Sequence, residues 1–429
     1  MPEIIKYVSQ DNINEFAQEM NQKQKTIFAS KNTADSTFTN VKAFGAVGDG
    51  TTDDAVAIQN AIDYAHQHGG VVFFPNGEYV LASVHFNTSD PNTAHALRVY
   101  SNMTMLGDGG AVLKQGNASV THMIYPDVAN DAEGYGGCHD IVIDSISFDS
   151  NSGDYSETNI TPLNLCHGEN ITIRNCKFYN GHGWHSIEIN SCANVLIENC
   201  SFVDNGGNTE DIQIDSADGN GNLGMNDNTC CFYITIKNCN FFSEGHVSIG
   251  NHSNPTVGNH EEIKIFNNLF NGQDATSYIQ FVSHTADVFI FNNTFYCDGV
   301  TAPIAVAGTP NYIYENSLID NTTPIANAIS INNWVNGKFL DGIFSYNGIV
   351  LPNVPDDLTT LLQHQQIGSL IVTAYNNSVT ANRPSNDSGI CISFRNPGSG
   401  GYGWQIALTN GGFYKRIYTS AHFEAWTAL

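Results

Sequence analysis

The sequence predicts an all-β solenoid, in which coils of parallel strands stack around one core. The first observation is an alternating apolar and polar segment that recurs as IVIDSISF, ITIRNCKF, VLIENCSF, ITIKNCNF, IKIFNNLF and VFIFNNTF. The second is that every segment ends in phenylalanine, at Phe148, Phe178, Phe202, Phe241, Phe270 and Phe295. Their spacings of 30, 24, 39, 29 and 25 residues are typical of coils with unequal loops. Because one strand cannot bury its apolar face alone, the segments are expected to stack.

A third observation is a row of asparagines in register with the phenylalanines: Asn175, Asn199, Asn238, Asn267 and Asn292. Asparagine tolerates left-handed backbone geometry, and stacked amides can bond from coil to coil. An antiparallel β-sandwich is the alternative fold, but its strands recur every eight to twelve residues. The longer repeat in this chain favours the solenoid.

Before the repeats, residues 41–81 predict a strand, a glycine-rich turn, a helix, a second turn and a strand. Thr52 or Asp53 is expected to cap the helix, and Gly69-Gly70 to end it. The helix's apolar stripe is predicted to comprise Val56, Ile58, Ala61, Ile62 and Ala65. The GDGTTDD run resembles a phosphate loop or a metal site, but no lysine follows its glycines, which favours a structural cap.

This capping segment and the repeats resemble the pectate-lyase-like superfamily, which includes phage tailspikes and polygalacturonase relatives. The resemblance implies a right-handed parallel β-helix whose first coil is covered by the helix, which protects an open sheet edge. The HSIEINS and EDIQID segments also resemble parts of such proteins from Gram-positive bacteria and their phages. The DxD-plus-DD pattern of polygalacturonases and the YG-DPH segment of epimerases are not found, which disfavours those two activities.

Four regions are predicted along the chain. Residues 1–40 are a polar attachment or association segment, in which Ile13, Phe16, Ala17 and Met20 have helical spacing. Residues 41–335 form the β-helix, and residues 336–367 are a linker. Residues 368–429 resemble the knob that ends many phage tail fibres. That resemblance depends on Trp404-Gln405-Ile406-Ala407, Gly411-Gly412, Tyr414-Lys415-Arg416 and Trp426.

The composition restricts the partners and the compartment. Asp and Glu number 42 against 16 Lys and Arg, and the formal net charge of −26 disfavours nucleic acid, anionic membranes and polyanionic substrates without a cation. Of ten cysteines, Cys176, Cys200 and Cys239 share one repeat position and are predicted to be buried free thiols. No zinc-site spacing, signal peptide or transmembrane run is found, so release by cell lysis as a virion component is expected.

A second strand in each coil is predicted to carry the functional site. Aligning PLNLC, SIEIN, DIQID, HVSIG and YIQFV gives an outward polar column of Asn164, Glu188, Gln213, Ser248 and Gln280. Asp211 and His246 are expected on one side of this column, and Asn190 and Asp215 on the other. Glu188 should lie about 8 Å from both aspartates, a separation suited to an inverting glycosidase.

The predicted catalytic residues are therefore Glu188, Asp211 and Asp215, with His246 assisting proton transfer. Crowding is expected to raise the pKa of one carboxyl so that it stays protonated as the acid. The substrate-binding set is predicted to be Asn164, His185, Asn190, Glu210, Gln213, Asp218, Ser248 and Gln280. No metal ligand or cofactor is assigned, although the acidic cluster could hold a calcium ion.

These features predict a phage tailspike-like depolymerase that hydrolyses a bacterial surface or capsular polysaccharide. Three alternatives remain open: a polysaccharide lyase acting on the same face, a non-catalytic receptor-binding fibre, and a secreted bacterial glycanase. The expected partners are the host glycan, two further copies in a homotrimer, and the phage tail or baseplate at the N-terminal segment.

Overall fold

The computed structural model describes residues 38–319 with short gaps, and beyond them mainly a set of strands. The gaps are residues 85–93, 129–131, 157, 204, 206–209, 218–226, 243–244, 252–257, 273–276, 283, 298–299, 301 and 308–310. The predicted helix at residues 13–20 and residues 340–367 of the predicted linker lie outside the described residues, whereas Lys338 and Phe339 of that linker form a short strand. No helix in the described part of the chain is long and apolar enough to cross a membrane.

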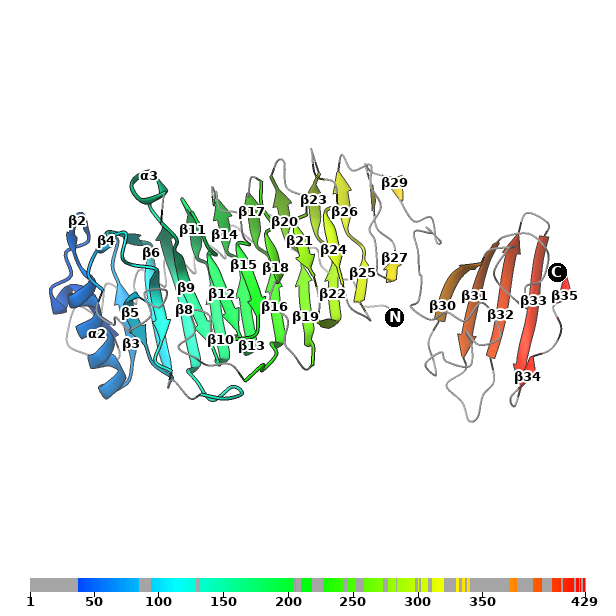
Figure 1. Cartoon of the computed structure of the whole chain (residues 1–429), viewed down its shortest axis with the longest axis horizontal. Coiled ribbons are helices and arrows are strands. Elements are labelled where there is room, and N and C mark those ends of the chain that lie inside the picture. Colours follow the sequence, from blue (N-terminus) through cyan, green and yellow to red (C-terminus); the bar gives the residue numbers. More distant parts are fainter. Residues whose placement is uncertain are drawn as a thin grey trace, which may run out of the picture.

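The described chain forms a right-handed parallel β-helix, which confirms the predicted fold class (Figure 1). One side of the coils is a parallel eight-stranded sheet. Its strands are β5 (His95–Val99), β7 (His122–Pro126), β9 (Thr161–Cys166), β12 (Ile187–Asn190), β15 (Ile212–Asp215), β18 (Ile249–Asn251), β21 (Ile279–Phe281) and β24 (Ile304–Val306).

A twenty-one-stranded sheet forms the rest of the coil wall in two rows of strands. The first row contains β1 (Phe38–Asn40), β3 (Val71–Phe74), β6 (Met103–Gln115), β8 (His139–Asp149), β10 (Glu169–Arg174), β13 (Ala193–Glu198), β16 (Phe232–Lys237), β19 (His260–Phe266), β22 (Thr285–Phe291), β25 (Asn311–Tyr314) and β27 (Ile329–Ile331). The second contains β2 (Asp49–Asp53), β4 (Gly77–Leu81), β11 (Lys177–Tyr179), β14 (Ser201–Val203), β17 (Asn240–Phe242), β20 (Leu269–Asn271), β23 (Thr294–Tyr296), β26 (Ser317–Ile319), β28 (Trp334–Val335) and β29 (Lys338–Phe339). The long strands β6 and β8 take part in both rows.

The six phenylalanines stack inside the solenoid, as predicted. All are fully buried, and neighbouring ring centroids lie 4.7, 5.2, 4.7, 4.8 and 4.7 Å apart with nearly parallel planes. This spacing matches the separation of adjacent strands, so each coil places one ring on the ring of the coil before it.

The predicted asparagine row marks the bend between the two strand rows. The backbone φ angles of Asn175, Asn199, Asn238, Asn267 and Asn292 lie between 53° and 57°. Non-glycine residues rarely adopt this left-handed region, and asparagine tolerates it best. The repeated Asn therefore fixes where each coil turns.

Two buried side-chain ladders line the inner corners of the coils. At one corner the backbone N–H groups of Cys239, Asn268 and Asn293 each donate to the side-chain oxygen of the next asparagine, at 2.8–3.0 Å. At the other corner the backbone N–H of Cys192 donates to Cys231 Sγ, and the backbone N–H of Cys231 donates to His260 Nδ1. Both ladders satisfy amides that the coil bends would otherwise leave buried and unpaired.

The cysteine column consists of free thiols, as predicted, and all nine described cysteines are free. Burial raises the pKa of the Cys200 thiol well above its usual value, so the thiol is unreactive. Replacing Cys200 with Ser is expected to lower the free energy of unfolding by about 1–3 kcal/mol, because the hydroxyl is buried among poorly placed carbonyls. Urea unfolding would measure this loss. Cys230→Ser, at a half-buried position outside the column, is the matched control and should change little.

A pH-dependent loss of stability is expected from His260. Burial, and next the nearby His284, lower the pKa of His260 to about 4, whereas an unfolded histidine titrates near 6.5. The unfolded chain therefore binds a proton that the folded chain rejects, and stability falls by about 3 kcal/mol as the pH drops from 6.5 to 4.

The test compares urea unfolding of the wild type and His260→Asn at pH 7 and pH 4.5. Asn should preserve the acceptor for the Cys231 N–H, just as the Asn268 side chain accepts from the Cys239 N–H. The variant should lose less stability on acidification than the wild type. Equal losses in the two proteins would show that His260 does not titrate in this range.

The capping helix α2 (Ala55–His68) covers the first coils and ends before Gly69, as predicted. Its N-cap residue is Asp54 rather than Thr52 or Asp53, and the Asp54 carboxylate accepts from the N–H groups of Val47 and Gly48. The predicted apolar stripe of this helix is wrong at Val56, which is exposed. The other short helices are η1 (Val41–Phe44) and α3 (Ser152–Tyr155).

The buried side of α2 contains a polar residue, Gln59, which the predicted apolar stripe did not include. Gln59 is buried there because its amide bonds both backbone groups of Arg98, at 2.8 and 3.2 Å. This pairing ties the helix to β5.

The C-terminal residues form a separate antiparallel sheet. Its strands are β30 (Leu370–Tyr375), β31 (Gly389–Arg395), β32 (Gly403–Thr409), β33 (Gly412–Thr419), β34 (His422–Phe423) and β35 (Thr427–Ala428). β32 and β33 pair directly across residues 410–411, so the predicted hairpin is present.

Candidate functional site

The eight-stranded sheet places the predicted polar column around Glu188. In the register of the parallel strands, Glu188 lies beside Asn164 on one side and Gln213 on the other. The next coils contribute Gly250 and Gln280 to this column. The prediction that Ser248 belongs to it is wrong, because β18 is shifted by two residues.

Glu188 is held by three neighbours. The Asn190 amide donates to Glu188 Oε1 at 2.9 Å, and the Asn164 amide donates to Oε2. His122 Nε2, from β7, lies 3.9 Å from the same Oε2. Asn164 is fully buried and its Oδ1 has no hydrogen-bond partner among the described residues. These contacts fix the Glu188 carboxylate on the outer side of the sheet.

The surroundings keep Glu188 ionised. Burial alone would raise the pKa of its carboxyl, but the His122 side chain, the charge of His185 and the Asn190 amide together hold the pKa at about 2. Glu188 can therefore act as a base or as a fixed negative charge. Crowding of carboxylates was expected to raise the pKa of one of them, but the pKa of Glu188 is lowered instead.

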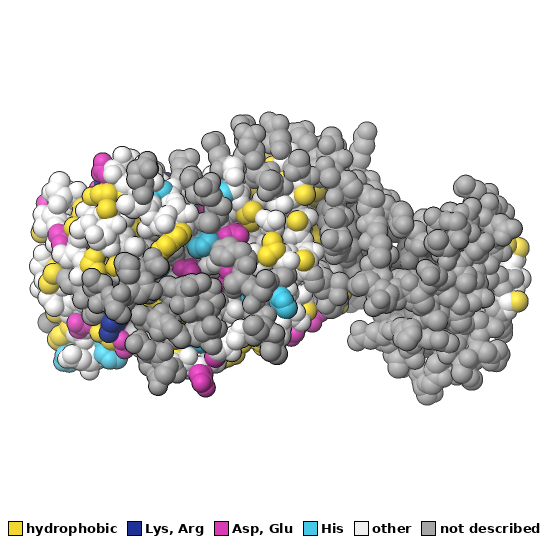
Figure 2. All heavy atoms as spheres, in the orientation of Figure 1, with side chains coloured by type: hydrophobic (Ala, Val, Ile, Leu, Met, Phe, Trp, Pro, Cys, Tyr) yellow, Lys and Arg dark blue, Asp and Glu magenta, His cyan; other side chains and the backbone are white. Residues whose placement is uncertain are grey.

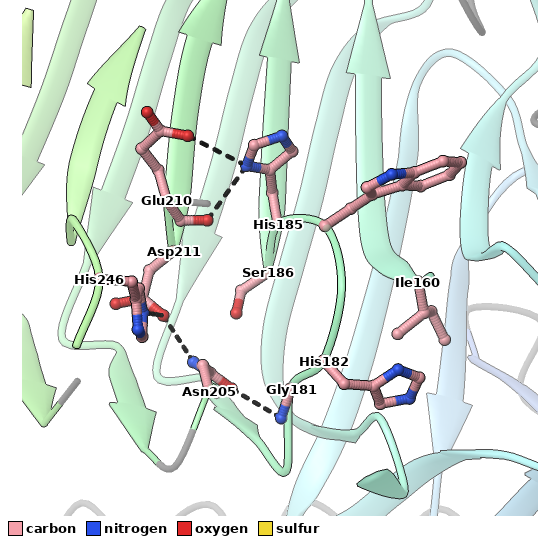
Figure 3. A pocket seen from close by; sticks show the side chains of 10 residues that line it. Ile160, Gly181, His182, His185, Ser186, Asn205, Glu210, Asp211 and His246 are labelled. Atoms are coloured by element: carbon pink, nitrogen blue, oxygen red, sulfur yellow. Dashed lines mark hydrogen bonds and ion pairs between the residues drawn. The ribbon is translucent and has the colours of Figure 1, made fainter. Parts of the chain in front are cut away.

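Asp211 and His246 form a second pair in the next coils (Figure 3). His246 Nε2 lies 3.3 Å from Asp211 Oδ1, and the Asn205 amide donates to the same oxygen at 2.7 Å. Asp211 is two positions before Gln213, so it lies diagonally across from Glu188. The predicted separation of about 8 Å therefore agrees with the strand register.

Glu210 and His185 form a third pair, and they share a column as expected. His185 Nδ1 lies 3.5 Å from Glu210 Oε2 and 3.1 Å from the Glu210 carbonyl oxygen (Figure 3). Both side chains are less than one-tenth exposed. The coils of β7, β12, β15 and β18 thus bring three carboxylate–histidine pairs to one face.

A small hollow, partly open to solvent, lies beside two of these pairs. Figure 2 shows acidic and histidine side chains together near the middle of the visible face of the solenoid. The residues that line the hollow are Ile160, Gly181, His182, Trp184, His185, Ser186, Asn205, Glu210, Asp211 and His246. Of the predicted site residues, His185, Glu210, Asp211 and His246 line it, whereas Glu188 and Asp215 lie outside its wall.

The outward column is far less solvated than the alternating pattern implies. Asn164, Asn190, Asp211, Gln213 and Asp215 are all at most 4% exposed. The Gln213 amide donates to Asp215 Oδ2 at 2.7 Å, so these two outward side chains satisfy each other. Buried polar side chains with internal partners hold a site rigidly, which a solvated polar face does not.

Sequence reasoning missed four residues of the site: His122, Trp184, Asn205 and His182. His122 lies in the HMIYP segment, which was not aligned with the other second strands although its register with β9 is regular. Trp184 directly precedes the HSIEIN strand, and an aromatic residue beside a polar column is the signal that could have identified it. Its indole ring lies 5.9 Å from the His122 ring, between centroids.

Gln280 lies apart from the hollow. Gln280 is half-buried in the same column as Gln213, two coils further on. Asp218 lies outside the described residues. No group of three or more His, Cys, Asp or Glu side chains in the described part of the chain is arranged to hold a metal ion.

This chain is similar to one known family and to several known proteins over part of its length. The model of the rhamnogalacturonase A/epimerase, pectate lyase-like family matches residues 38–274. Plasmin and fibronectin-binding protein A of Streptococcus pneumoniae is 32% identical over 183 residues, which are 39% of this chain and 24% of that protein. Alginate lyase 7 of Azotobacter vinelandii is 48% identical over 71 residues, which are 16% of this chain and 8% of that protein. The aligned part thus spans about a quarter or less of these relatives.

Solved structures give the same fold. The surface adhesin PfbA of Streptococcus pneumoniae superposes with a TM-score of 0.54 at 22% sequence identity. The superposition covers 70% of this chain and 85% of that one. At this level of identity the likeness concerns the fold, and the site must be interpreted from its own residues.

Proposed function

Because this chain belongs to the rhamnogalacturonase A/epimerase, pectate lyase-like family, we propose that it binds a bacterial surface polysaccharide and cleaves it by glycosidic hydrolysis. The observation that carries the proposal is the set of three carboxylate–histidine pairs on one face of the solenoid, two of which line a hollow. The strand register places the Cα atoms of Glu188 and Asp211 about 8 Å apart, and carboxylates at about this separation leave room for the water of an inverting mechanism.

In this proposal the two carboxylates have different roles. Glu188, ionised above about pH 2, takes a proton from water as the water attacks the anomeric carbon. Asp211, in the hollow, gives its proton to the leaving glycosidic oxygen, and His246 beside it returns a proton for the next cycle. Trp184 offers an aromatic surface on which a sugar ring can stack.

The direct test incubates purified protein with a panel of bacterial surface polysaccharides and measures new reducing ends. Hydrolysis predicts reducing ends without ultraviolet absorbance from an unsaturated product. Reducing ends accompanied by that absorbance would indicate a lyase and overturn the proposed reaction while preserving the proposed site.

Glycan binding without cleavage is the second candidate. It is favoured by the similarity to a streptococcal protein named for binding plasmin and fibronectin, and to a structure described as an adhesin. Under this alternative the same polysaccharides would bind, but neither reducing ends nor a fall in viscosity would appear.

We also propose that the chain is a homotrimer attached to a phage tail. The support is the resemblance of the C-terminal segment to phage fibre knobs, whose strands β32 and β33 form the expected hairpin. Sedimentation equilibrium at micromolar concentration should give three times the chain mass of 46.6 kDa. A mass of one chain would contradict the trimer and leave the glycan site unaffected.

A further inference from the structure

Apart from Arg98 of β5, the described basic residues of the β-helix lie outside the eight-stranded sheet. Between residues 115 and 337 the sequence contains only four lysines and arginines: Arg174, Lys177, Lys237 and Lys264. All four lie in strands of the twenty-one-stranded sheet, namely β10, β11, β16 and β19. Strands β7 to β24 of the eight-stranded sheet therefore contain no lysine or arginine.

Each of these four cations interacts locally on its own sheet. Arg174 pairs with Asp144 at 2.8 Å, Lys237 with Glu198 at 3.0 Å, and Lys264 with Glu262 at 3.1 Å. The Lys177 ammonium lies 4.6 Å from the centroid of the Tyr179 ring. They face away from the hollow because they lie on the other wall of the solenoid.

The nearest fixed cation on the eight-stranded sheet is Arg98 of β5. It shares the column of Glu188 three coils away, a distance of about 14 Å along the stack. It also pairs with Asp127 at 3.1 Å. A charge that distant is largely screened at physiological ionic strength, where the Debye length is about 8 Å.

Among the residues that the structure describes, histidines are thus the only groups lining the hollow that could carry positive charge. His122 faces Glu188, His185 faces Glu210, and His246 faces Asp211. Asp215, on the same sheet, adds a fourth carboxylate. In Figure 2, acidic and histidine side chains are visible at this place without lysine or arginine among the described residues.

This distribution of charge selects among glycans. A uronate, sulfate or phosphate group in the hollow would lie beside carboxylates, with each nearby imidazole already facing its own carboxylate. Like charges a few ångströms apart in a partly desolvated site repel strongly. Sugar hydroxyls, in contrast, can donate to the carboxylates and accept from the histidines.

We propose that the sugars recognised in the hollow are uncharged: they carry no carboxylate, sulfate or phosphate. The inference rests on the proposed function and specifies its substrate class. It separates this chain from a site built for polyuronates, because in the described part of the chain strands β7 to β24 of this wall hold no lysine or arginine that could neutralise a uronate.

The test uses a matched pair of polysaccharides that differ only in charge. A uronic-acid-containing bacterial polysaccharide and its carboxyl-reduced form have the same linkages, and a sulfated polysaccharide and its desulfated form make a second pair. Binding and reducing-end release should be at least about tenfold greater for the neutral member of each pair, with chelator or with calcium present.

The outcomes distinguish this inference from the proposed function. Stronger binding or faster cleavage of the charged member, with or without calcium, would overturn the inference while hydrolysis stands. Selective binding of the neutral member without cleavage would support the inference and contradict hydrolysis. Failure to bind either member of any pair in the panel would overturn both.

Variants that add a positive charge to the sheet give a second, independent test. Gln213→Lys places an ammonium beside Glu188 and should shift the ratio of charged to neutral affinity by about tenfold toward the charged member. Gln280→Lys, half-buried in the same column, keeps the test available if Gln213→Lys does not fold, and should shift the ratio in the same direction. Asn240→Lys, exposed on the other sheet, adds the same charge and should leave the ratio unchanged. Equal ratios in all three variants would overturn the inference.

Discussion

Turnover of a susceptible glycan is expected to fall at least about a hundredfold when Asp211 is replaced by Asn, the usual size of a general acid–base contribution. The amide has nearly the same shape but cannot exchange a proton with His246 or with the leaving oxygen. Glu188→Gln should lose as much, because an amide cannot take a proton from water. Initial rates of reducing-end release would measure both effects.

Binding of the glycan should survive both changes, since the hollow keeps Trp184 and His185. Glu198→Gln is the matched control: Glu198 is also a partly buried glutamate paired with a cation, Lys237, but it lies on the other sheet. Its turnover should equal that of the wild type. Near-normal turnover of folded Asp211→Asn and Glu188→Gln would place the chemistry elsewhere on the molecule.

The low pKa of Glu188 adds a further expectation to this experiment. Because Glu188 stays ionised down to about pH 2, it cannot cause a loss of activity between pH 3 and 6. An acidic limb in that range must come from another group. A proton donor must be protonated to act, so its titration causes the alkaline limb of the profile, and loss of that limb in Asp211→Asn would identify Asp211 as the donor.

The features that the sequence predicted correctly are those that repeat locally. The phenylalanine and asparagine rows recur once per coil, so each further copy strengthens the same assignment. The left-handed φ of all five asparagines follows from the residue type and its place after an alternating strand. The free cysteines followed from the same register, because they directly follow asparagines of that row.

The misplacement of Ser248 has a physical cause in the period of a strand. A slip of one residue turns every side chain to the opposite face, whereas a slip of two residues preserves the alternation of buried and outward positions. HVSIG therefore fits the sheet equally well in two registers. Only the pairing of Ile249 with Ile212 places Gly250 beside Gln213.

The environment of Glu188 could not be predicted because it depends on distant parts of the chain. His122 lies 66 residues earlier in the sequence, and its contact with Glu188 arises only after β7 and β9 have stacked under β12. Alternation in a strand distinguishes inward from outward positions but not exposed from covered ones. Consequently the polar column was identified correctly except at Ser248, while its burial and the low pKa of Glu188 were not predicted.

Phe241→Ala is expected to lower the free energy of unfolding by about 3–5 kcal/mol, the usual cost of removing a fully buried phenylalanine. The Phe241 ring is fully buried and stacks on Phe202 at 4.7 Å and on Phe270 at 4.8 Å. Its removal leaves a cavity in the middle of the column and ends two ring contacts at once. Urea unfolding followed by circular dichroism would measure the loss.

The adjacent residue supplies the control for this prediction. Phe242 lies on the same strand, β17, but points outward and is 37% exposed. Phe242→Ala removes the same atoms from the chain and should cost less than about 1 kcal/mol, because little apolar surface returns to water. Equal losses for the two variants would show that the phenylalanine column does not stabilise the solenoid more than any other apolar surface. A large loss confined to Phe241→Ala would show that each coil depends on the rings directly above and below it, as nearest-neighbour stabilisation of a solenoid requires.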